Sequence, residues 1–211
     1  MSEVYGRLSE AVIEGKLKDI RSLTESALGG GATPQQVLDE GLLPGMDEVG
    51  KRFKVGDMFI PEVLLSAKTM AAAMEVLKPL LAKGGGGRGT VVIGTVQGDL
   101  HNIGKNLVAM MLEGAGFEVV DLGIDVKPQA FLDAVKQHKP NLLGMSALLT
   151  TTMPRMGETI RALEEAGIRS QVKVMVGGAP VTQEFVAKIR ADAYAANAGT
   201  AVDVAKSLVG G

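Results

Sequence analysis

The sequence predicts a protein of α plus α/β class, in which a four-helix bundle precedes a doubly wound, five-stranded parallel sheet. Two observations predict this fold. In residues 1–83, apolar side chains recur three to five positions apart, as on one face of a helix. From residue 90 onward, short β-branched runs alternate with helical stretches. The segment GGGGRG, residues 84–89, separates the two patterns and predicts a linker, so we expect domains at 1–83 and 90–211.

Turn and cap residues divide the first domain into its helices. Gly15 separates two short helices near the N-terminus. A third helix is expected after Thr33, a favourable N-cap residue, with Pro34 at its first position. Pro61 opens a fourth helix, which has a broad apolar face. Four such helices joined by short connections indicate a small bundle.

The second domain contains five expected strand–helix units. The strands are expected within residues 90–96, 118–123, 141–147, 172–178 and 193–196, and the helices within 102–116, 128–138, 155–166, 182–190 and 200–208. Continuous apolar strands separated by helices indicate a parallel sheet that is covered on both faces, of Rossmann or flavodoxin-like order. Ligands of such domains bind at the carboxyl ends of the strands, so the loops there are the candidate functional loops.

Composition excludes several classes of function. The 211 residues carry a formal net charge of −2 and only 3% aromatic residues, which argues against nucleic acid and membrane partners. The absence of cysteine excludes disulfides and thiolate chemistry. The start, MSEVYGRLSE, does not read as a signal peptide, and no apolar run is long enough to span a membrane. We therefore expect a cytoplasmic protein.

The loop after the first strand carries the most informative residues. Residues 94–106 read GTVQGDLHNIGKN and place Asp99 and His101, one of only two histidines, at this strand end. The glycines lack the G-x-G-x-x-G spacing of a nicotinamide dinucleotide site, and the chain has no P-loop. The few aromatic residues disfavour a flavin site. A phosphate-accepting receiver domain is disfavoured because the third strand ends at Ser146 rather than at an aspartate.

A zinc site and a catalytic triad are both disfavoured, which leaves two interpretations of His101. A protein-only zinc site needs three or four ligands, and the second histidine, His138, is expected at the opposite edge of the sheet. There is also no nucleophile elbow that would indicate a catalytic triad. His101 could instead bind a metal inside a large cofactor that brings its other ligands, while Asp99 accepts the second ring N–H. The alternative is a loop histidine that caps the following helix.

Three short segments together resemble the cobalamin-binding domains of methyltransferases such as methionine synthase. GDLHNIG, SALLTTT and VGGAP occur in the order of the family motifs D-x-H-x-x-G, S-x-L and G-G, at the ends of the first, third and fourth strands. Upstream, GMDEVGKRFKVGDMFIPEVLLSAKTM is similar to the helical cap that precedes the cobalamin domain. The chain length resembles that of the stand-alone corrinoid proteins of multi-component methyltransferase systems.

The resemblance implies a set of cofactor-binding residues. Cobalamin would bind base-off/His-on, with His101 as the cobalt ligand and with Asp99 and Thr152 completing a hydrogen-bonded relay. The other implied cofactor-binding residues of the α/β domain are Asn102, Gly104, Ser146, Leu148, Thr150, Gly177, Gly178, Ala179 and Ala198. In the cap, Phe53, Ile60 and Val63 would cover the upper corrin face, although Val63 could equally belong to the bundle core.

The resemblance also implies the function. The protein would be a methyl carrier rather than an enzyme by itself. Its cob(I)alamin would accept a methyl group from a donor-specific methyltransferase and pass it, as methyl-Co(III), to a second methyltransferase that acts on tetrahydrofolate or a thiol. A reductive activase would be a further partner, and the cap would swing aside through residues 84–89. A mutase subunit and a cobalamin sensor are the alternatives, and the sequence does not give the methyl donor.

Overall fold

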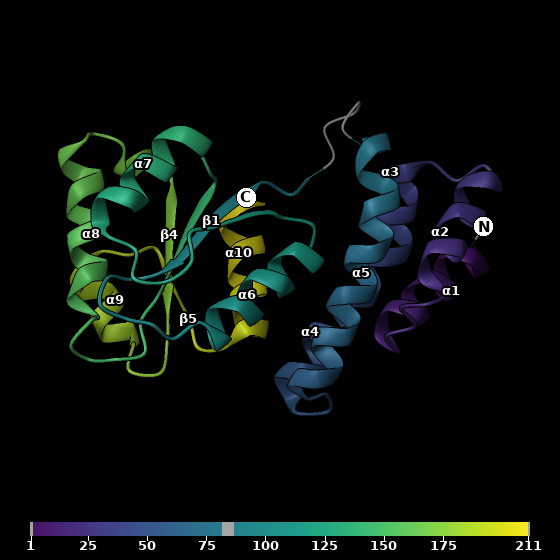
Figure 1. The fold of residues 1–211 in the computed structure, drawn as a ribbon, viewed down its shortest axis with the longest axis horizontal. Coiled ribbons are helices and arrows are strands. Elements are labelled where there is room, and N and C mark those ends of the chain that lie inside the picture. Colours follow the sequence, from purple (N-terminus) through teal and green to yellow (C-terminus); the bar gives the residue numbers. More distant parts are fainter. Residues whose placement is uncertain (1, 82–86, 211) are drawn as a thin grey trace. The chain divides into compact units, whose positions relative to one another are not determined.

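The computed structural model describes residues 2–81 and 87–210 and divides into two compact units (Figure 1). The first unit is helical, and the second, an α/β unit, begins at Arg88. Half of the expected linker, residues 84–86, lies outside the described residues. No helix among the described residues is long and apolar enough to cross a membrane.

The helical unit contains the helices that the sequence predicts. These are α1 (Ser2–Ile13), α2 (Ile20–Gly29), the continuous segment α3–η1–α4 (Pro34–Gln36, Val37–Leu42 and Leu43–Val55) and α5 (Ile60–Leu81). Gly15, with φ +65°, turns the chain between α1 and α2. Thr33 caps α3 as expected, because its hydroxyl accepts the Gln36 N–H at 3.2 Å while the Gln36 side chain accepts the Thr33 N–H at 3.0 Å.

The segment Val37–Leu42, labelled η1, is a π-helix, which the sequence analysis did not predict. Pro44 follows it and has no N–H with which to continue the α-helical pattern. The Leu43 N–H bonds to the carbonyl of Leu38, five residues earlier. The helix therefore widens by one residue at this point and then continues as α4.

The α/β unit is a five-stranded parallel sheet of order β2–β1–β3–β4–β5, which selects flavodoxin-like order over Rossmann order. The strands are β1 (Thr90–Thr95), β2 (Glu118–Asp121), β3 (Leu142–Ser146), β4 (Lys173–Gly177) and β5 (Ala193–Ala195). Helices α7 (Pro128–His138), α8 (Pro154–Glu165) and α9 (Gln183–Ile189) lie on one face, and α6 (Ile103–Gly114) and α10 (Ala198–Val209) lie on the other (Figure 1). A short 3₁₀ turn, η2 (Arg169–Gln171), precedes β4.

The core under α7 and α8 determines the position of β1. Phe131 of α7 and Met156 of α8 are fully buried against the sheet. A Cβ at Gly94 would lie 2.9 Å from the Phe131 ring, so β1 requires glycine there. β1 itself is buried from Val91 to Thr95 and lies between β2 and β3, so it is an inner strand of the sheet.

The carboxyl ends of four strands are in register. Thr95 of β1 pairs with Ser146 of β3, Ser146 pairs with Gly177 of β4, and Gly177 pairs with Ala195 of β5. The strand order reverses between β1 and β3, since β1 leads to β2 on one side and β3 leads to β4 on the other. The loops after β1 and β3 therefore face each other across the switch point, where ligands of this fold bind.

Candidate functional site

Asp99 lies at the centre of the switch point. The chain turns after β1 through Gly98, with φ +83°, and the Asp99 N–H closes the turn on the Val96 carbonyl at 3.1 Å. This turn directs the carboxylate into the protein, where Asp99 is fully buried. Its Oδ1 accepts the backbone N–H of His101 at 3.1 Å and lies 2.7 Å from Nδ1 of the same residue. One carboxylate oxygen thus fixes both the backbone and the ring of the histidine.

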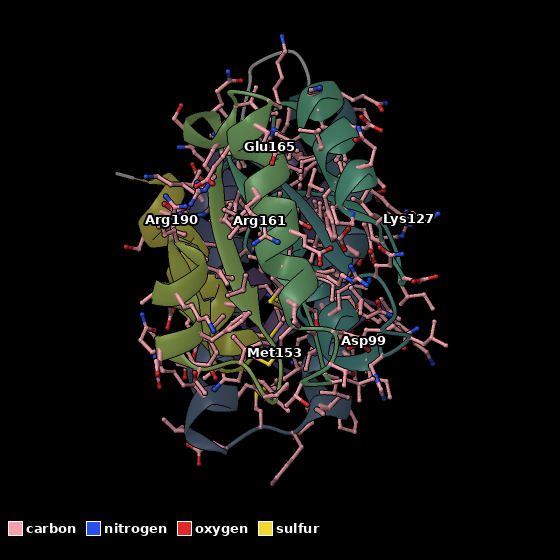
Figure 2. All side chains as sticks on the ribbon, turned by 90° about the vertical axis from the view of Figure 1, so that its left-hand side faces the viewer. Asp99, Lys127, Met153, Arg161, Glu165 and Arg190 are labelled. Carbon is pink, nitrogen blue, oxygen red and sulfur yellow. The ribbon has the colours of Figure 1, made fainter. Side chains whose placement is uncertain are left out.

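The second oxygen of Asp99 joins the loop after β3. Oδ2 accepts the N–H of Leu148 at 2.7 Å, the N–H of Leu149 at 3.3 Å and the hydroxyl of Thr152 at 2.9 Å. Figure 2 shows Asp99 at the same end of the α/β unit as Met153, which precedes α8, and at the opposite end from Glu165. Hydrogen bonds therefore connect Asp99, His101 and Thr152, and the role of this set as a relay stays a prediction.

The surroundings of Asp99 keep its carboxylate charged. Burial alone would raise the pKa, but hydrogen bonds from the Leu148 N–H, from the His101 ring and N–H and from the Thr152 hydroxyl hold the pKa of Asp99 well below its usual range. An anion beside Nδ1 makes that nitrogen the donor, so Nε2 carries the free lone pair. The His101 side chain is 52% exposed, which leaves this ring accessible.

His101 is a single potential metal ligand, and it therefore fits a metal that brings its other ligands with it. Within residues 2–81 and 87–210, no group of three or more histidine, aspartate or glutamate side chains could hold a metal ion. His138 ends α7, whose C-terminus leads to the amino end of β3, so it lies at the opposite edge of the sheet, as expected. A single oriented imidazole suits a metal already held by a macrocycle rather than a free ion.

Exposed apolar side chains lie on the loops near His101. Leu100 and Ile103, which flank the His101 turn, are 68% and 77% exposed. Leu148 and Leu149, whose N–H groups bind Asp99, are 42% and 41% exposed, and Ile124 of the loop after β2 is 40% exposed. These five side chains, which we call the apolar rim, lie on or beside the three loops that are hydrogen-bonded to one another near Asp99, and they form a surface suited to a broad, largely apolar ligand.

Gly104 adds space beside the same loop. It occupies the first turn of α6, and a Cβ placed on it would meet no atom within 4 Å. Packing within the chain therefore does not require glycine here. Asn102, whose carbonyl accepts the Asn106 N–H at 2.8 Å, is exposed and directly precedes the same helix.

The other expected α/β residues lie along the carboxyl edge of the sheet. Ser146 and Gly177 belong to the row of paired strand ends, Thr150 and Ala179 are exposed in the following loops, and Ala198 is buried at the start of α10. Gly177 and Gly178 are required by the chain itself. An added Cβ would lie 2.8 Å from the Ala195 carbonyl oxygen at Gly177 and 1.8 Å from the Ala147 carbonyl oxygen at Gly178, where φ is +128°.

The expected cap residues belong to the helical unit. Phe53 of α4 is partly exposed, and Ile60, the first residue of α5, is 45% exposed, so both have surface available to a ligand. Val63 is fully buried, which favours the alternative that it belongs to the core. Its role in covering a cofactor stays a prediction, as do those of Phe53 and Ile60.

Three site features were missed by the sequence analysis. Thr95 donates its hydroxyl to the His101 carbonyl at 2.9 Å, and Asp125 accepts the Gly98 N–H at 2.7 Å. The buried Lys105 ammonium pairs with Asp121 at 2.5 Å and links α6 to β2. Thr95 and Lys105 lie within residues 94–106, the segment that contains the D-x-H-x-x-G motif. Neither their spacing nor their residue type distinguishes them from ordinary core and surface positions.

Comparison with known proteins identifies the family. Two family models, each described as a B12 binding domain, match residues 4–78 and 89–205. The chain belongs to the corrinoid proteins with B12 binding domains. It is 43% identical over 210 residues to trimethylamine corrinoid protein 1 of Methanosarcina acetivorans, covering 98% of this chain and 97% of the relative. It is 44% identical over 209 residues to the dimethylamine corrinoid protein of Methanosarcina barkeri, covering 98% of both.

A solved structure of the family shows the same fold in a methyltransferase system. A chain of the methanol:cobalamin methyltransferase complex MtaBC from Methanosarcina barkeri matches with a TM-score of 0.87 and 34% identity, covering 99% of this chain and 80% of that chain. The corrinoid family resemblance and the fold class predicted from sequence are thus confirmed. The residues present fit a corrinoid: one oriented imidazole, an apolar rim and open space at Gly104 meet at one edge of the sheet.

Proposed function

We propose that the protein is a corrinoid methyl carrier that binds cobalamin base-off/His-on through His101 in the cytoplasm. The observation that carries the proposal is the Asp99–His101 contact of 2.7 Å at the switch point, which leaves Nε2 as the free ring nitrogen. When bound, the cobalt of the corrinoid supplies the nucleophile that takes up a methyl group and later releases it to an acceptor.

The residues of the chain would perform the supporting steps. His101 would supply the axial nitrogen, and Asp99 orients the ring by accepting its Nδ1–H. Thr152 and the N–H groups of Leu148 and Leu149 hold Asp99 as an anion. The apolar rim would cover the corrin edge and exclude water from the imidazole. The space at Gly104 and the strand ends at Ser146 and Gly177 would accommodate the nucleotide tail.

The partners of this function are three enzymes. A donor-specific methyltransferase would load the carrier, a second methyltransferase that acts on tetrahydrofolate or a thiol would unload it, and a reductive activase would restore the reduced cofactor. The 43% and 44% identical relatives are named for trimethylamine and dimethylamine, whereas the methanol complex is 34% identical. Methylamines are therefore the donors to test first.

Visible spectra of the protein reconstituted with methylcobalamin test the axial ligation. The wild-type protein should retain the corrinoid and show a nitrogen-ligated spectrum that His101→Ala converts to the unligated form. His138→Ala, at the opposite edge of the sheet, should leave the spectrum unchanged. Retained corrinoid with identical spectra in wild type and His101→Ala would contradict ligation by His101, and no retained corrinoid would contradict the proposed function as a whole.

A further inference from the structure

Two residues outside the relay hold the His101 loop at its two ends. Thr95, the last residue of β1, donates its hydroxyl to the His101 carbonyl at 2.9 Å. Asp125, in the loop between β2 and α7, accepts the Gly98 N–H on Oδ1 at 2.7 Å and donates its own N–H to the Asp99 carbonyl at 3.1 Å. We call Thr95 and Asp125 the loop clamp.

The backbone of Asp125 is in an uncommon conformation. Its φ is +53°, in the left-handed region that residues with a side chain seldom adopt, although aspartate tolerates it better than most. Val126, the next residue, bridges to Val96 and donates its N–H to the Thr95 carbonyl at 3.0 Å. The left-handed turn therefore directs the carboxylate and the N–H of Asp125 toward two consecutive residues of the His101 loop.

Burial makes the Thr95 contact difficult to replace. Thr95 is fully buried, so its hydroxyl cannot exchange this bond for one to bulk water. Thr95 also belongs to the row of strand ends and pairs with Ser146. The His101 carbonyl is thereby fixed to β1, an inner strand of the sheet.

The clamp leaves few degrees of freedom to the segment between its two ends. Gly98, Asp99 and His101 each have a backbone group bonded to a residue of the clamp. The Asp99 carboxylate fixes the His101 ring itself. We propose that Thr95 and Asp125 are positioning residues that keep the backbone of residues 98–101 stationary while the contact between Nε2 and the cobalt forms and breaks. This inference rests on the proposed function, because it concerns the same ligand.

Variants of Asp125 separate its carboxylate from its backbone conformation. Asp125→Gly accepts the positive φ without strain but removes the acceptor for the Gly98 N–H. Asp125→Asn keeps an acceptor oxygen and also tolerates the left-handed region. Asp125 is exposed, so neither change disturbs the core. For Thr95, Thr95→Val removes the hydroxyl at nearly constant shape, and Thr95→Ser retains it.

The first measurement is the proportion of His-ligated to unligated methylcobalamin in each saturated variant, read from the visible spectrum. Asp125→Gly should lower this ratio about tenfold, as expected for a hydrogen bond to a charged group, and Thr95→Val about fivefold, as expected for a neutral one. Asp125→Asn and Thr95→Ser should stay close to wild type. If Thr95→Val does not fold, the ratio measured for Asp125→Gly tests the proposal by itself.

The second measurement needs no cofactor. Amide hydrogen exchange at Gly98 in the corrinoid-free protein should accelerate in Asp125→Gly but not in Asp125→Asn, because only the first loses the acceptor. His-ligated wild type with unchanged ratios and exchange in Asp125→Gly would overturn the clamp alone. A wild-type protein that retains the corrinoid without histidine ligation would overturn both the clamp and the proposed ligation.

Discussion

Asp99 accepts five hydrogen bonds from four residues, and each of its oxygens serves a different loop. Three of the donors are backbone N–H groups, which cannot become acceptors. The site thus specifies a carboxylate rather than an amide. Because the carboxylate is also fully buried, no water is available to compensate for a lost partner.

Replacement of this carboxylate should weaken both stability and ligation. In Asp99→Asn, one amide NH₂ must face donors, so we expect a loss of about 2–3 kcal/mol in the free energy of unfolding. Urea unfolding measures it, and Asp133→Asn, on the surface of α7, is the matched control. The variant should also bind methylcobalamin with less His101 ligation. Unchanged stability would show that the buried hydrogen bonds are easily rearranged.

Gly104 should show opposite effects on stability and on binding. Gly104→Ala places a methyl group in space that the chain leaves open, and it favours the α6 helix by roughly 0.5 kcal/mol. If the open space accommodates the cofactor, the same methyl group should weaken methylcobalamin binding severalfold. Thermal unfolding of the corrinoid-free protein and equilibrium binding of methylcobalamin measure the two effects. Unaltered binding would remove Gly104 from the site.

At the scale of elements, the ion pair between Lys105 and Asp121 connects α6 to β2. The two partners are unequally buried, since the Lys105 side chain is 2% exposed and the Asp121 side chain is 39% exposed. Asp121 also accepts the Gly123 N–H at 2.8 Å, which shapes the loop that leads to Asp125. The loss of Lys105 and the loss of Asp121 should therefore affect stability to different extents.

Removal of the acid should cost more than removal of the base. Asp121→Ala leaves a buried ammonium whose remaining side-chain partner, among the residues that the structure describes, is the Asn106 amide oxygen, and we expect a loss of about 3 kcal/mol. Lys105→Met leaves a carboxylate that water can reach, and the loss should be about 1 kcal/mol. Chemical denaturation of the two variants compares them, and equal losses would show that burial does not govern the pair.

Element boundaries followed from the sequence where a local signal exists. Thr33 and Pro34 carry cap chemistry in their side chains, and Gly15 accepts a positive φ because it has no Cβ, so the end of α1 and the start of α3 could be predicted. The π-helical widening before Pro44 could not, because it depends on which of two carbonyls the Leu43 N–H selects. Pro44 interrupts the α-helical pattern nearby, but residue type does not specify which carbonyl is selected.

Some residues of the candidate site could likewise be predicted from the sequence, and others could not. Asp99, His101 and Thr152 could be named because the family resemblance supplied their motif, and the structure connects them by hydrogen bonds. The N–H groups of Leu148 and Leu149 could not, because every residue except proline carries this donor. The contact of Asp125 depends on a positive φ and on the register of a neighbouring loop, both of which arise only from tertiary packing.

For the whole molecule, the depressed pKa of Asp99 makes stability depend on pH in acid. A free aspartate has a pKa near 3.9, and hydrogen bonds hold the folded-state pKa of Asp99 below that. The unfolded chain therefore binds more protons below about pH 4, and stability falls as the pH decreases. Above that pH the contribution of Asp99 is fully present.

Chemical denaturation of the corrinoid-free protein between pH 6 and pH 2 measures this dependence, in roughly half-unit steps. The free energy of unfolding should decline more steeply below about pH 4 in wild type than in Asp99→Asn, which has no carboxyl to protonate at this position. Asp133→Asn should retain the wild-type slope. Parallel curves for wild type and Asp99→Asn would mean that other acids account for the decline.

The hydrogen bond between Asp99 and Thr152 joins residues 53 positions apart in the chain. Between them lie α6, β2, α7 and β3, and the two loops meet only once β3 has paired with β1. Closure of so long a loop is slow compared with formation of a helix turn. A chain emerging from the ribosome therefore completes the hydrogen bonds of Asp99 only after residue 152 is synthesised, so under the proposed function corrinoid loading would follow assembly of the sheet in time.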